Sequence, residues 1–274
     1  MPPLPESSRR EGPYADPVPT GSRTIGALFD ASVDADPARP FVTFYDQSAG
    51  ERVELSGATT RNWVDKTANL LLDVLGASPG SRVSLALPTH WQTLVWLLAC
   101  WRIGALVDPD PGADADVAVI GPHIKHGGDL PKAAEVVATS LHPLGARFEQ
   151  SLPIGVTDFG AEVFAQADTV TAGLAPSTDT PAWQERSLLD HRAVIERGET
   201  AVRRLGLGTG ARILTDANPA TLDGAVTAVV APLLIRGSVV LVRHHDPATL
   251  LALTASERVD VTVLGTPSAG FDAP

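Results

Sequence analysis

The sequence contains little cysteine, few aromatic residues and no long apolar run. Cys100 is the single cysteine in 274 residues, so no disulfide can form within the chain. The longest apolar run, 93–100, is too short to cross a bilayer. Residues 1–22 lack the apolar segment that a secretory signal needs. These absences exclude a disulfide framework and a membrane span, and they predict a cytoplasmic protein.

Positive charge is also scarce. Asp and Glu number 32 against 21 Lys and Arg, which gives a formal net charge of −11. Such an acidic chain argues against nucleic acid as a partner. Hydrophobic residues make up 44% of the chain, enough for the core of one large α/β domain. We expect residues 1–22, rich in proline, serine and charge, to form a flexible tail and residues 23–274 to form the domain.

Helical and strand patterns alternate from residue 24 onward. The helical patterns span 24–37, 60–75, 90–104, 160–168, 188–205, 222–235 and 246–259. The strand patterns span 41–46, 52–55, 83–87, 105–108, 115–121, 134–141, 211–216, 238–244 and 259–265. Valine-rich strands between helices predict an α/β fold with a mostly parallel sheet and helices on both faces. Such sheets bind ligands beyond the carboxyl ends of their strands.

The helix predicted at 90–104 is apolar on most sides. Trp91, Trp96 and Trp101 lie five residues apart on it, so they point in different directions, and we expect them to pack in the core. Cys100 lies in the same apolar run and is expected to be a buried residue rather than a nucleophile.

Two segments resemble the adenylate-forming enzymes, the superfamily of acyl-CoA synthetases and peptide-synthetase adenylation domains. Gly76 with 79–83 resembles the pattern G-x-x-P-G-D-R-V, and 102–105 resembles K/R-x-G-A. Residues 188–242 resemble the stretch that follows the phosphate loop. The resemblance implies the core of the family's larger domain, truncated before the adenine-binding segments and the C-terminal lid domain.

The resemblance places the family's phosphate loop, S-G-T-T-G-x-P-K-G, at 177–185. Ser177 and Thr180 keep the family residue, whereas the other positions do not: Thr178 replaces a glycine, Asp179 a threonine, Pro181 a glycine, Trp183 the proline and Gln184 the lysine. A phosphate cradle needs free backbone amides and glycine conformations, and proline supplies neither. A carboxylate about 4 Å from a phosphate charge costs about 4 kcal/mol at a dielectric near 20.

The sequence therefore predicts a degenerate loop, no catalytic residue and no nucleotide cofactor. A contrary hypothesis is that Asp179 and Glu185 bind Mg²⁺ and recruit ATP through it. His123, His126 and Asp129 are too loosely spaced for a metal site and are expected to be solvated loop residues. His244 and His245 are expected to be plain polar residues at a strand end.

A candidate pocket follows the strand predicted at 211–216. The family's pocket motif falls on 218–224, where Thr221 stands in place of a histidine, Asp223 is acidic and Gly224 is kept. The favoured hypothesis is a non-adenylating relative that binds a small carboxylate, acyl or CoA-like molecule, or a protein partner such as a second copy. The alternative is residual ATP-dependent acid activation, or acyl or CoA binding, completed by another chain.

Overall fold

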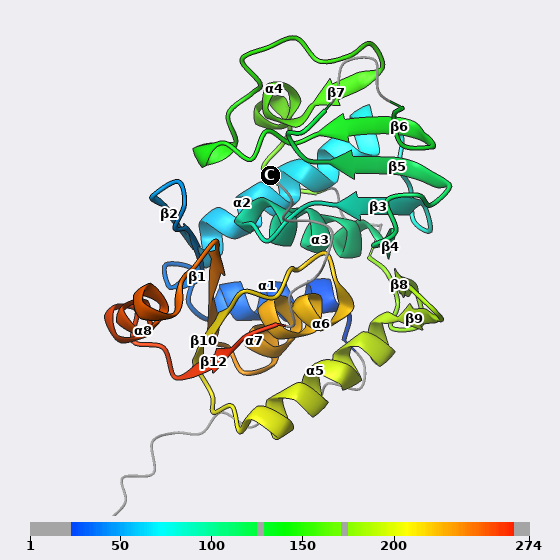
Figure 1. The fold of residues 1–274 in the computed structure, drawn as a ribbon. Helices are drawn as coiled ribbons and strands as arrows, with labels where there is room; N and C mark the ends of the chain where they lie inside the picture. Colours follow the sequence, from blue (N-terminus) through cyan, green and yellow to red (C-terminus); the bar gives the residue numbers. More distant parts are fainter. Residues whose placement is uncertain (1–22, 125–128, 171–174, 266–274) are drawn as a thin grey trace, which may run out of the picture.

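The computed structural model describes residues 23–124, 129–170 and 175–265 (Figure 1). The expected tail at 1–22 lies outside these residues. None of the helices in the described ranges combines the length and apolar character that a bilayer crossing requires.

The strands divide between two sheets. The first sheet has the order β12-β10-β11-β1-β2, and only β2 runs antiparallel to its neighbour. Its strands are β1 (Pro40–Asp46), β2 (Glu51–Ser56), β10 (Arg212–Thr215), β11 (Ser238–Arg243) and β12 (Val261–Val263). The register of β1 on β11 pairs Val42 with Val239.

The second sheet has the order β7-β6-β5-β3-β4-β8-β9, and only the last pair is antiparallel. Its strands are β3 (Arg82–Ala86), β4 (Leu106–Asp108), β5 (Ala115–Ile120), β6 (Ala133–Ala138), β7 (Val156–Asp158), β8 (Pro181–Gln184) and β9 (Leu188–Asp190). The predicted α/β class with mostly parallel strands is confirmed, and the division into two sheets is new.

Most helices begin and end at the signals that the sequence carries. Thr24 caps the first helix through Oγ1, and Asp246 caps the last through its carboxylate. Gly206 ends α5 with a φ of +63°. The helices are α1 (Ile25–Ala35), α2 (Gly57–Asn69), α3 (Trp91–Ile103), α4 (Phe159–Glu162), α5 (His191–Leu205), α6 (Leu222–Ala225), α7 (Ala231–Leu234) and α8 (Pro247–Ser256). Two π-helical turns, Leu70–Val74 and Val226–Val230, follow α2 and α6.

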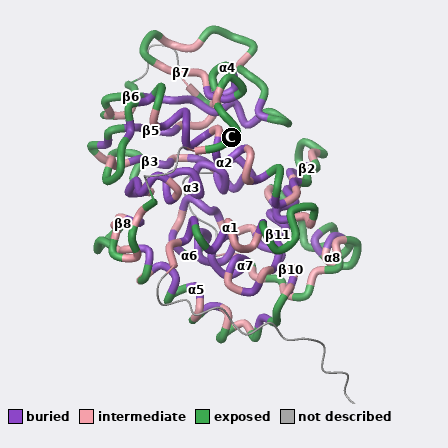
Figure 2. The backbone as a smooth tube through the Cα atoms, turned by 180° about the vertical axis from the view of Figure 1, so that it is seen from behind, coloured by how far each residue is buried: buried purple, intermediate pink, exposed green. Residues whose placement is uncertain are grey.

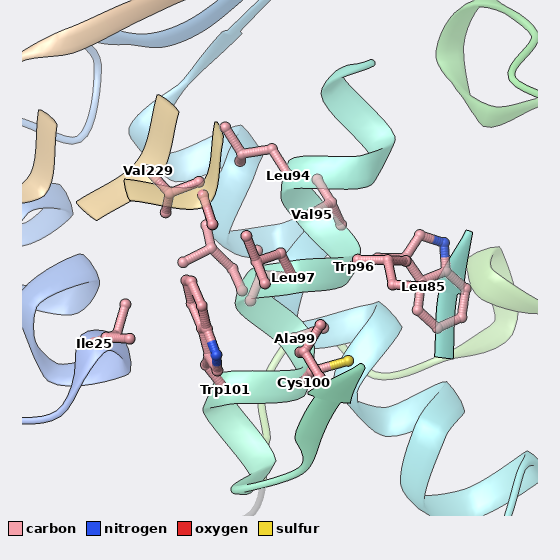
Figure 3. Close-up of a cluster of buried hydrophobic side chains, with 14 of the residues drawn as sticks. Ile25, Leu85, Leu94, Val95, Trp96, Leu97, Ala99, Cys100, Trp101 and Val229 are labelled. Carbon is pink, nitrogen blue, oxygen red and sulfur yellow. The ribbon is translucent and has the colours of Figure 1, made fainter. Parts of the chain in front are cut away.

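Helix α3 lies at the centre of the molecule. It packs against β1 of the first sheet and against β3 and β4 of the second. It is buried along its length apart from the partly exposed Arg102, and it appears in purple in Figure 2. Trp91, Trp96 and Trp101 are fully buried, as predicted, and Figure 3 shows two of them pointing to different sides of the helix.

Helix α8 covers the opposite face of the first sheet. Leu250 and Leu253 pack there against Leu214, Val240 and Val242. This sheet therefore has helices on both faces (Figure 1).

Candidate functional site

Residues 177–180 form a tight turn that satisfies its own polar groups. The Ser177 amide donates to Oγ1 of Thr180 at 3.0 Å, and the Thr180 amide donates to the Ser177 carbonyl at 3.2 Å. The amides of His191 and Arg192 donate to the carbonyls of Thr180 and Thr178 at 3.2 and 3.1 Å. Two amides that a phosphate cradle would offer are therefore already used within the turn.

The acidic residue of this turn has a local partner. Oδ1 of Asp179 lies 2.5 Å from a guanidinium nitrogen of Arg192, and the two side chains are 72% and 51% exposed. An exposed pair of this kind contributes little to stability. The pair does neutralise Asp179, so the repulsion between this carboxylate and a phosphate is smaller than the sequence predicted. The main obstacle to phosphate binding is therefore that the backbone amides of the turn are already used.

The second half of the predicted loop is a strand. Residues 181–184 form β8, which pairs with β9 in an antiparallel hairpin and with β4 at Trp183. Trp183 is fully buried in the main core, and Nε1 of Trp101 donates to the Ala182 carbonyl at 2.9 Å. The expected loop at 181–184 and the expected helix start at Leu188 were therefore wrong, because these residues form β8 and β9 and the buried Trp183 anchors β8 to the sheet.

The candidate pocket residues shape the turn into α6. Thr221 caps this helix, since its Oγ1 accepts from the Gly224 amide at 3.2 Å and donates to the Asn218 carbonyl at 2.8 Å. A Cβ on Gly224 would lie 1.8 Å from that carbonyl oxygen, so only glycine fits. Asp223 is exposed.

A cavity of about 730 Å³ lies beyond the carboxyl ends of β10, β11 and β12, and we call it the first-sheet cavity. Thr221 and Asp223 line it, as do Arg197 and Arg204 of α5. Glu185 also lines it, whereas the described phosphate-loop residues Ser177, Thr178, Asp179, Thr180 and Gln184 do not. The structure thus brings Thr221 and Asp223 to a cavity, whereas Gly224 does not line it and only Glu185 of the predicted loop does.

A histidine–carboxylate pair lies at the strand ends in this cavity. Nε2 of His245 is 3.0 Å from Oδ2 of Asp216, and Oδ1 of Asp216 accepts from the Gly265 amide at 2.6 Å. Within the described residues, Nδ1 of His245 is buried without a hydrogen-bond partner. From the sequence, His245 was expected to be a plain polar residue at a strand end, so its pairing with Asp216 was missed.

His244 belongs to a second polar cluster. Oδ1 of Asp46 lies 3.0 Å from Nδ1 of His244, and Oδ2 accepts from Arg243 at 2.5 Å. Burial alone would raise the pKa of Asp46, but hydrogen bonds from His244, Ser48 and Arg243 hold it well below its usual range. Ser48 and Asp46 both contact the same nitrogen of His244, so the three side chains are not arranged as a nucleophile, base and acid relay.

This cluster borders a larger cavity of about 1480 Å³ at the carboxyl ends of β1, β3, β5 and β11, which we call the inter-sheet cavity. His123 and Asp129 line it, and His126 lies outside the described residues. Over the described ranges, no three His, Cys, Asp or Glu side chains gather in a way that could hold a metal ion. The strand-end positions of Asp46 and Asp216 were the signal in the sequence that could have pointed to both clusters.

Comparison with known proteins relates part of the chain to AMP-binding enzymes. Residues 29–111 match the family model described as AMP-binding enzyme. A TIGR03089 family protein of Mycobacterium tuberculosis is 36% identical over 252 residues, which cover 88% of this chain and 98% of that protein. The chain therefore belongs to the TIGR03089 family, and the predicted relation to the adenylate-forming superfamily is confirmed.

Solved structures of similar fold have longer chains. An acyl-CoA synthetase of Brucella canis superposes with a TM-score of 0.72 at 20% identity, over 89% of this chain and 47% of that chain. The acetoacetyl-CoA synthetase from Streptomyces lividans gives a TM-score of 0.71 at 18% identity, over 89% and 42%. The chain thus spans less than half the length of each, and the likeness establishes the fold.

Proposed function

We propose that this protein binds a small carboxylic acid or its acyl derivative in the first-sheet cavity and does not adenylate it. The observation that carries the proposal is strand β8, which contains 181–184 of the segment that resembles the phosphate loop. Pro181 offers no amide, and Trp183 holds the strand in the core. Opening this segment around a triphosphate would expose a buried tryptophan, and no lysine compensates at Gln184.

The cavity itself supplies groups for an acid. Arg197 and Arg204 are seven residues apart on α5 and so lie on one face of the helix. Within the described residues, neither guanidinium has a hydrogen-bond or ion-pair partner, and both are exposed. The similar solved structures are named for acyl-CoA and acetoacetyl-CoA synthesis, which makes an acid the first ligand class to test.

The first experiment compares nucleotides with acids by thermal shift and calorimetry. A ligand at 100 times its dissociation constant stabilises a fold by about 2.7 kcal/mol. We expect such a shift with an aliphatic carboxylate or acyl-CoA and none with ATP–Mg²⁺ or AMP. Exchange of pyrophosphate into ATP, or an ATP shift that disappears in a Ser177→Ala, Thr180→Ala double variant, would instead establish acid activation.

A second experiment localises the acid. Replacing Arg197 and Arg204 together by glutamine removes two cations from the cavity, so acid binding should weaken about tenfold or more. Arg203→Gln is the matched control, because Arg203 lies on the same helix but pairs with Glu199 at 3.9 Å and contacts Thr200. An equal loss of acid affinity in the double variant and in Arg203→Gln would mean that the acid binds elsewhere.

A further inference from the structure

The inter-sheet cavity adjoins the first-sheet cavity at Arg243 and His244, which line both, and most of its wall surface is apolar. Ile120, Pro122, Leu141 and Pro88 are among the residues that line it. Its polar side is formed by the ends of β1 and β11 and by the first residue of β2. The volume of about 1480 Å³ is ample for a small molecule.

The arginines that line this cavity are already neutralised. Arg243 forms an ion pair with Asp46 at 2.5 Å. Arg52 lies 2.7 Å from Glu54 and 3.1 Å from Glu257. Neither guanidinium is therefore available as an unpaired cation for a ligand.

The Glu51 side chain, unlike these arginines, forms no ion pair or hydrogen bond among the described residues. It lines the cavity, and its Oε1 atom is buried with no hydrogen-bond partner among the described residues. Burial raises the pKa of this carboxyl and the neighbouring Asp46 carboxylate raises it further, against smaller opposing effects of Arg243 and His142. A buried carboxylate oxygen without a donor costs free energy, and a ligand that supplies a donor would recover it.

Two residues that line this cavity have a left-handed backbone conformation. Leu141 and His244 have φ values of +58° and +52°. Left-handed conformations are costly for such residues and cluster at binding sites, where the surrounding structure holds them in place.

We propose that the inter-sheet cavity binds a small amphipathic amine, with the ammonium group paired with Glu51 and the apolar chain against Ile120 and Leu141. The unpartnered carboxylate supplies the charge complement, and the apolar walls supply the burial energy. The remaining titratable groups of the lining are His123, His142, His244 and Asp129, of which Asp129 is exposed and lies outside the strand ends.

The test uses three probes with a six-carbon chain: hexylamine, hexan-1-ol and hexanoate. Each is titrated at pH 7.5, and binding is followed by calorimetry and by amide chemical shifts. We expect hexylamine to bind and to shift the amides around Glu51 and Ile120. Glu51→Gln keeps the shape of the side chain and removes its charge. Hexylamine affinity should therefore fall about tenfold or more, which corresponds to the free energy of a charged hydrogen bond.

Glu54→Gln is the matched control, since Glu54 lies on the same strand but pairs with Arg52. It should leave hexylamine affinity within about twofold, as expected for an exposed pair. Unfolding curves of both variants confirm the fold, and Glu51→Gln removes an unpaired charge and so should not destabilise it. Equal binding of hexylamine and hexan-1-ol, or equal affinity in wild type and Glu51→Gln, would overturn the proposal.

Discussion

His191, the first residue of α5, is expected to make the stability of the fold depend on pH. Its side chain is fully buried, Nδ1 accepts from the Ile25 amide at 3.4 Å, and Nε2 has no partner within the described residues. Desolvation lowers the pKa of His191 to about 4, against a smaller opposing effect of Asp190. A protonated ring would also lose the acceptor that the Ile25 amide uses.

The direction of the pH dependence follows from the pKa of His191 in the folded and in the unfolded chain. The imidazole has a pKa near 6.5 in the unfolded chain, so between pH 6.5 and 4 the unfolded state binds more protons than the native one. The stabilisation is thus complete above pH 6.5 and is lost as the pH falls toward 4. A tenfold change in proton affinity corresponds to about 1.4 kcal/mol, so the loss amounts to about 3 kcal/mol.

Urea unfolding of the wild type and of His191→Asn at several pH values between 7.5 and 4 tests this. Asparagine keeps an acceptor near the position of Nδ1 and does not titrate. His90 is also buried, and desolvation lowers its pKa as well, but it is unchanged in both proteins, so the difference curve reports His191 alone. We expect the difference in unfolding free energy to shrink by about 3 kcal/mol between pH 7 and 4. A difference that stays constant across this range would refute the reasoning.

Three further outcomes follow from local contacts. Gly224→Ala should destabilise the fold by about 1–3 kcal/mol in urea unfolding, because the added Cβ would lie 1.8 Å from the Asn218 carbonyl oxygen. Gly208→Ala is the control and should not destabilise the fold, because a Cβ at Gly208 would have no atom within 4 Å. Thr24→Ala removes the cap of α1, in which Oγ1 accepts from the Ala27 amide at 3.2 Å, and should cost about 1 kcal/mol. Burial raises the pKa of Cys100 to about 12, so native protein should react with a thiol reagent at pH 8 far more slowly than denatured protein; equal rates would contradict its burial.

The order of elements could be predicted from the sequence because it depends on local patterns. Thr24 and Asp246 mark helix starts by their side-chain oxygens, and Gly206 marks a helix end by its left-handed backbone. The replaced phosphate-loop residues were likewise visible, since proline lacks an amide wherever it stands. That 181–184 form a strand was not visible, because the pairing of β8 with β4 and the burial of Trp183 depend on residues about 80 positions away.

The sequence by itself determined the α/β class, the helix caps and the chemistry missing from 177–185. Only the tertiary structure decided that the strands form two sheets, and that the carboxyl ends of β1 and β11 bring Asp46 beside Arg243 and His244 across nearly 200 residues. Strand order depends on contacts between residues far apart in the chain, such as those of α3 with β1, β3 and β4, whereas caps and turns depend on neighbours in the chain. The cavities depend on strand order, so the strand-end position of Asp216 could hint at a site near His245, but Glu51 could not be assigned to a cavity beforehand.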